Sequence, residues 1–162
     1  MRMFSRTLTA GLVVAATALT GTATAVAADT PPTAVEDFEY PQADKIFQER
    51  GIKLKSGDGH ITLVACDSQT GLIEIFAQGM SKVDKVGGGK YCFRVTGKGG
   101  YLNLEVPRVY GASGNDYDVS VNMITADEEK PFKLKKNAWT PVGKSADDQN
   151  REFTLLKITA TK

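Results

Sequence analysis

The sequence predicts an all-β fold, an antiparallel β-sandwich (or barrel) of about seven to eight strands with one short N-terminal helix. Apolar and polar residues alternate in short runs between residues 52 and 160, which is the period of a half-buried strand. Segments rich in Gly, Ser, Asn and Asp separate these runs, and such residues favour turns. Residues 44–50 instead form one short helix, because Gly51 stops it directly afterwards.

Each predicted strand presents one apolar face. Residues 101–106, for example, place Leu102, Leu104 and Val106 on the side of the core. The doublet at residues 155–156 breaks the alternation of the last strand and predicts a β-bulge there. The predicted strands cover residues 52–55 (an edge strand), 60–66, 72–78, 91–96, 101–106, 117–123, 132–135 and 152–160.

The first 28 residues have the organisation of a secretory signal peptide. Arg2 and Arg6 precede an uncharged stretch over residues 8–26, and small residues at 25–28 offer a cleavage site. The alternative is a membrane anchor, since the uncharged stretch is long enough to span, but its truly apolar part is short. We therefore expect cleavage after residue 27 or 28 and a secreted, extracellular protein.

The remainder divides into two parts. Residues 29–43 contain three prolines and several acids and predict an extended leader. Residues 44–162 predict a single β domain. Removing residues 1–28 takes away two arginines and no acid, which leaves 18 basic and 19 acidic residues. A net charge near −1 argues against a nucleic-acid partner and against docking to an anionic membrane after signal cleavage.

Cys66 and Cys92 predict one disulfide, because an even cysteine pair in an exported chain oxidises. Both lie opposite the main apolar face of their predicted strands, so the bridge should lie at a sheet surface or edge. A reactive cysteine with His60 as its base is the alternative. No motif for a cofactor is present, since the glycine-rich segments 87–90 and 97–100 lack the spacing of a phosphate-binding loop.

The sequence predicts neither an enzyme nor a metal site. His60 is the only histidine, and no Gly-x-Ser-x-Gly elbow accompanies it, so we interpret it as an exposed residue at a strand start. Residues 114–118 together with Asp58 could offer oxygen ligands to calcium, but the full pattern of a calcium loop is absent. The simpler interpretation of residues 114–118 is a turn in which Asn115 and Asp116 bind their own backbone.

Exposed aromatic and basic residues give the candidate ligand surface. It comprises Trp139, Tyr101, Tyr110, Lys133 and Lys135. For Trp139 the alternative is a core residue that closes one end of the sandwich. For the lysines the alternative is a charged edge that prevents strand-to-strand aggregation.

Four segments resemble small secreted proteins of filamentous actinobacteria, a group without an assigned activity. They are residues 57–61, 92–95, 104–111 and 139–143, and together the resemblance spans most of the mature chain. It implies export and a Gram-positive source.

The predicted function is non-catalytic binding of an extracellular protein or cell-wall polymer. One alternative is a secreted protease inhibitor that presents residues 83–90 or 112–116 as bait. Another is a hydrolase that uses two converging carboxylates near Trp139 or His60.

Overall fold

The computed structural model describes residues 38–126 and 128–162. The predicted signal peptide and the first part of the predicted leader lie outside the described residues. The chain divides into two units, residues 1–33 and 34–162, and all described residues belong to the second. In this described part, no helix has the length and apolar character needed to cross a membrane.

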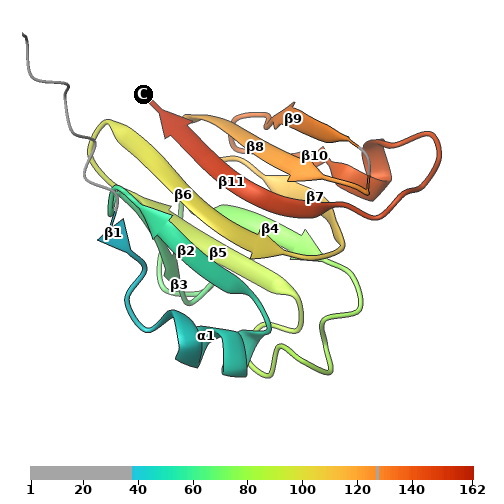
Figure 1. Ribbon diagram of the computed structural model, residues 1–162. Helices are drawn as coiled ribbons and strands as arrows, with labels where there is room; N and C mark the ends of the chain where they lie inside the picture. The colour runs from blue at the N-terminus through green and yellow to red at the C-terminus, as the bar shows by residue number, and fades with distance from the viewer. Residues whose placement is uncertain (1–37, 127) are drawn as a thin grey trace, which may run out of the picture. The chain divides into compact units, whose positions relative to one another are not determined.

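The second unit is a sandwich of two antiparallel sheets, as the alternation predicts (Figure 1). The six-stranded sheet has the order β1 (Phe38–Glu39), β2 (Lys53–Gly57), β6 (Gly99–Val106), β11 (Thr154–Thr161), β8 (Asp118–Ile124) and β9 (Glu129–Lys133). The five-stranded sheet has the order β10 (Trp139–Pro141), β7 (Val109–Ser113), β4 (Ile73–Ala77), β5 (Lys90–Val95) and β3 (Ile61–Val64). Two short helices accompany them, α1 (Ala43–Arg50) and the 3₁₀ helix η1 (Gly143–Ala146).

The sheets contain more strands than the sequence predicts, because three strands lack a clear alternating pattern. β7 includes Gly111, which has no side chain to mark a face, and β10 is only three residues long. β1 comes from the predicted leader and pairs Phe38 with Gly57 of β2. The strand predicted at residues 52–55 is present as β2, and the two-residue β1 pairs with its outer side only at Ser56 and Gly57.

The alternation itself and the predicted bulge are confirmed. Leu102, Leu104 and Val106 of β6 are fully buried between the sheets, together with side chains of β4, β5 and β8. The pairing of β11 with both β6 and β8 shifts between Leu155 and Lys157. Relative to β8, β11 contains one extra residue at this point, whereas relative to β11 the extra residue lies in β6.

The predicted disulfide between Cys66 and Cys92 is present, with 5.1 Å between the two Cα atoms. Cys92 lies in β5, and Cys66 follows the end of the edge strand β3. The bridge thus joins the end of an edge strand to its neighbour, at the place that the sequence predicts.

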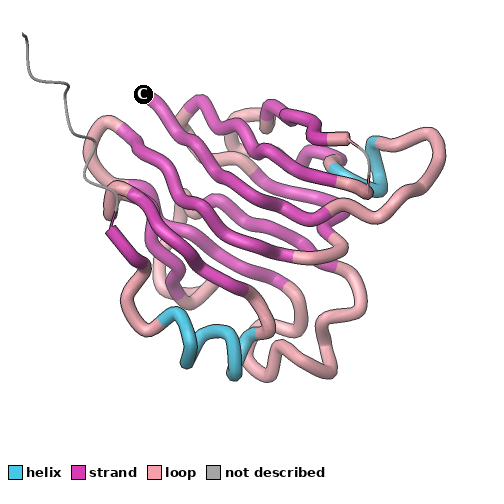
Figure 2. The backbone as a smooth tube through the Cα atoms, viewed as in Figure 1, coloured by secondary structure: helices cyan, strands magenta, loops and turns pink. Residues whose placement is uncertain are grey.

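α1 and the loop over residues 80–90 lie side by side at one end of the sandwich (Figure 2). The carboxylate of Asp84 accepts a hydrogen bond of 2.6 Å from Nε of Arg50, the last residue of α1. It also accepts hydrogen bonds from three backbone N–H groups of the loop, at 2.9 to 3.1 Å. Both charged side chains are buried, so this pair holds the loop against the helix.

Candidate functional site

Trp139 lies on the outer face of the five-stranded sheet. Its strand, β10, pairs Thr140 with Ala112 of β7, and both of these residues are buried. Neighbours in a strand point to opposite faces, so Trp139 and Gly111 point outward. Trp139 is 49% exposed, and the interpretation of this residue as a core plug is therefore wrong.

Gly111 provides the surface on which the indole rests. A Cβ atom at Gly111 would lie 2.6 Å from Nε1 of Trp139 and 2.7 Å from its Cζ2 atom, closer than real contacts allow. Only glycine lets the ring lie directly across the strand at this position. On the other side of Gly111, β4 places Phe76 in register with it.

Phe76 and Tyr110 continue the aromatic row. Their ring centroids are 6.4 Å apart, with an angle of 48° between the ring planes. The ammonium of Lys90 lies 5.6 Å from the centre of the Phe76 ring and 2.7 Å from Oε1 of Glu74. This ion pair borders the row, which we call the aromatic face; it comprises Phe76, Tyr110, Gly111 and Trp139.

A polar pocket of about 520 Å³ adjoins the aromatic face. Tyr110 belongs to both, and its carbonyl accepts a hydrogen bond from Val142, just before η1. This bond brings η1 beside β7, at the end of the five-stranded sheet (Figure 1). The pocket is lined by Ala77, Gln78, Gly79, Tyr110, Lys144, Ser145 and Asn150.

The five predicted ligand residues do not form one surface. Trp139 and Tyr110 belong to the aromatic face. Tyr101 and Lys133 lie on the six-stranded sheet, where the ammonium of Lys157 is 4.8 Å from the centre of the Tyr101 ring. Lys135 is exposed in the link between β9 and β10, and its backbone N–H binds Oγ1 of Thr140.

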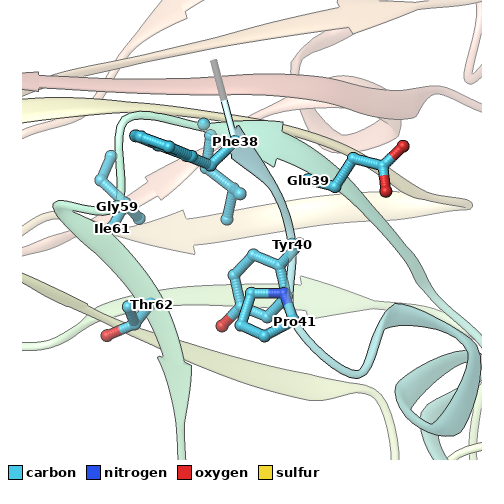
Figure 3. Close-up of a pocket in the computed structure, with 9 residues that line it drawn as sticks. Phe38, Glu39, Tyr40, Pro41, Gly59, Ile61 and Thr62 are labelled. Carbon is cyan, nitrogen blue, oxygen red and sulfur yellow. The ribbon is translucent and has the colours of Figure 1, made fainter. Parts of the chain in front are cut away.

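A second hollow of about 200 Å³ lies between β1 and the edge strand β3 (Figure 3). Phe38 reaches toward β3 in this view, and the hydroxyl of Tyr40 accepts a hydrogen bond of 2.8 Å from the Leu63 N–H. Tyr40 thereby satisfies one donor of an otherwise open strand edge. The walls of this hollow are almost wholly apolar, and the hydroxyl of Thr62, which lines it, is buried without a hydrogen-bond partner among the described residues.

His60 is half exposed at the start of β3, with Nδ1 3.5 Å from Oδ1 of Asp58. Asp58 also accepts hydrogen bonds from the backbone N–H groups of His60 and Tyr101, so it organises a turn. Asn115 is 1% exposed, and its side-chain oxygen binds the N–H of Tyr117, as the turn interpretation predicts. Across residues 38–126 and 128–162, no three or more His, Cys, Asp or Glu side chains form a group that could hold a metal ion.

The described carboxyl groups with shifted pKa values are all shifted downward. The guanidinium of Arg151 holds the pKa of Asp147 at about 2, and the same Arg151 binds Glu128 at 3.1 Å. Hydrogen bonds from Lys55 and Lys53 lower the pKa of Glu105. The three acids with lowered pKa values, Asp84, Glu105 and Asp147, are each bound to a cation.

Neither proposed bait segment is a fully exposed loop. Residues 112–116 contain the buried Gly114 and Asn115. The loop over residues 80–90 consists of turns, with Asp84 bound back to the Met80 carbonyl, although Val86 is 70% exposed on it.

Comparison with protein-family models finds no matching family, and comparison with curated proteins finds no match. The site therefore rests on the geometry alone. Sequence reasoning identified Trp139 and Tyr110 but missed Phe76, although the alternation within residues 72–78 already places Phe76 opposite the core. It also missed the role of Gly111, for which the sequence carries no signal.

Proposed function

We propose that this chain is an exported, non-catalytic domain that binds an extracellular polysaccharide, such as a cell-wall polymer, on the aromatic face. The observation that carries the proposal is the outward-facing row of Trp139, Phe76 and Tyr110 across neighbouring strands. Sugar rings stack on flat aromatic side chains, and a polymer needs several such platforms in line on an open surface.

The indole of Trp139 is positioned by its contact with Gly111, and one side of the residue remains exposed. Trp139 lies on Gly111 of β7, and the pairing of β10 with β7 holds the two residues side by side. Rigid aromatic platforms lose little side-chain entropy on binding, which favours affinity. The polar pocket beside Tyr110 adds donors and acceptors that can bind sugar hydroxyl groups.

Binding can be tested by affinity electrophoresis of the mature protein through gels that contain single polysaccharides, including purified cell-wall polysaccharide. We expect retardation by at least one polymer, and loss of about tenfold in affinity for Trp139→Ala, since about 1.4 kcal/mol corresponds to tenfold. The matched control is Tyr101→Ala, which removes a half-buried aromatic residue from the opposite sheet.

Three outcomes would contradict the proposal. The first is no retardation by any polymer. The second is an equal loss in Tyr101→Ala, which would place binding on the six-stranded sheet. The third is release of reducing sugar from the retarding polymer, which would make the protein a hydrolase.

A further inference from the structure

The pocket beside Tyr110 differs in charge from the rest of the aromatic face. Lys144 lines it, and no carboxylate is among its lining residues. Within the described part of the chain Lys144 forms no ion pair, whereas Lys90 at the other border is bound to Glu74 at 2.7 Å. Positive charge therefore remains available at the pocket end of the face.

A second cation lies beside the same pocket. The guanidinium of Arg108 donates a hydrogen bond of 3.3 Å to the carbonyl of Gly79, which lines the pocket. Arg108 forms no ion pair with any described carboxylate. On the adjoining loop, the carboxylate of Asp147 is bound to Arg151 at 2.6 Å. Lys144 thus lines the pocket and Arg108 binds one of its lining residues, and neither cation forms an ion pair with a described carboxylate.

The remaining lining residues complete an anion site. Gln78, Ser145 and Asn150 bring amide and hydroxyl groups that can donate hydrogen bonds to anionic oxygens. Because Tyr110 belongs to both the pocket and the aromatic face, a glycan chain stacked on that face reaches the pocket with its next sugar. We infer that the pocket binds an anionic substituent of the glycan, a carboxylate or a phosphodiester, so that the ligand is an acidic polysaccharide. This inference rests on the proposed function.

The test compares polygalacturonate with its fully methyl-esterified form, which has the same backbone and no charge. Glycosylated glycerol-phosphate teichoic acid, which carries sugar rings as well as phosphodiester groups, is the third probe. We expect the wild-type protein to bind one of the two anionic polymers about tenfold more tightly than the neutral ester, and less tightly as salt rises. The preferred anionic polymer identifies the group as a carboxylate or a phosphodiester.

Lys144→Gln should remove most of that preference, because it weakens binding of the preferred anionic polymer. Lys133→Gln, on the six-stranded sheet, is the matched control and should keep the preference. Neither lysine is buried, so the melting temperatures of both variants should match that of the wild type.

The outcomes separate the two claims. If the ester and both anionic polymers bind equally, the inference of an acidic ligand is wrong. If that equal binding is lost in Trp139→Ala, the aromatic face remains the binding site. If the preference for the anionic polymer survives in Lys144→Gln, or is lost in Lys133→Gln, the pocket is not the anion site. If neither these probes nor the wider polysaccharide panel binds, both claims fail.

Discussion

Replacing Asp84 by alanine should destabilise the domain more than any change at the surface. The change leaves Arg50, 8% exposed, with its charge buried and without its partner at 2.6 Å. It also leaves three loop N–H groups without the carboxylate that they bind. Breaking a buried ion pair by removing one partner costs about 3–5 kcal/mol. For a domain of this size, we expect a decrease in melting temperature of about 10 to 20 °C.

Thermal and urea unfolding of Asp84→Ala and of one control variant measure this loss of stability. The control is Glu105→Ala, which removes the partner of Lys53 and Lys55 on the solvent-exposed side of β6. Exposed pairs of this kind contribute about 0 to 1 kcal/mol. If Asp84→Ala loses no more stability than Glu105→Ala, the ion pair does not hold the loop to α1, and the reasoning is wrong.

The same pair predicts how stability depends on pH. Burial raises the pKa of Asp84, but the hydrogen bonds from Arg50 and from three backbone N–H groups outweigh burial, so the pKa falls below its ordinary value of 3.8. A carboxyl group with a lowered folded-state pKa stabilises the fold above its unfolded pKa and loses that contribution as pH falls through the folded value. The wild type should therefore lose stability below about pH 4, and Asp84→Asn should show a weaker dependence there.

Reduction of the disulfide and two further variants test separate parts of the fold. Reduction of the Cys66–Cys92 bridge should lower the melting temperature by several degrees, because it releases a loop with 26 residues of sequence separation; an unchanged melt would contradict a stabilising role. Gly99→Ala should cost about 2 kcal/mol or more in urea unfolding, since Gly99 has φ +105° and an added Cβ would meet the carbonyl of Ala160; wild-type stability would refute this. His60→Ala should leave both unfolding and polysaccharide binding unchanged, because His60 is exposed and far from the aromatic face in sequence and sheet order; lost binding would bring a catalytic or binding role back.

The fold was predictable where each strand has enough side chains to show its period. β6 and β8 each bury every second residue, and even the bulge of β11 is visible as a doublet at residues 155–156. β7 was missed because its sequence contains Gly111, which has no side chain to mark a face. β10 was missed because three residues are too few to show a period.

The candidate site was predictable only in part, because it depends on pairing between distant segments. Trp139 and Tyr110 could be selected as aromatic residues without a place in the predicted core. The sequence does not show that β10 pairs with β7, and that pairing alone brings the indole onto Gly111. The polar pocket likewise combines residues 77–79, 110, 144, 145 and 150, which only the fold brings together.

The sharpest prediction about the site concerns Gly111→Ala, because the indole of Trp139 rests on Gly111. Gly111 is not among the glycines with positive φ, so alanine can adopt the same backbone. Its methyl group would occupy the position of the indole, 2.6 Å from Nε1. Because Trp139 is half exposed on an edge strand, the ring can turn toward solvent, and we expect a loss of stability of only about 1 kcal/mol or less.

Polysaccharide affinity should nevertheless fall about tenfold in Gly111→Ala, as in Trp139→Ala, since the ring is still present but no longer held flat. The fluorescence of Trp139, the only tryptophan, should shift to longer wavelength as the ring enters water. Ser113→Ala is the matched control, because Ser113 faces Trp139 across the same strand pair and already has a Cβ atom. If Gly111→Ala shifts the fluorescence and leaves affinity intact, the orientation of the ring does not determine binding, and the aromatic face acts through exposed apolar area alone.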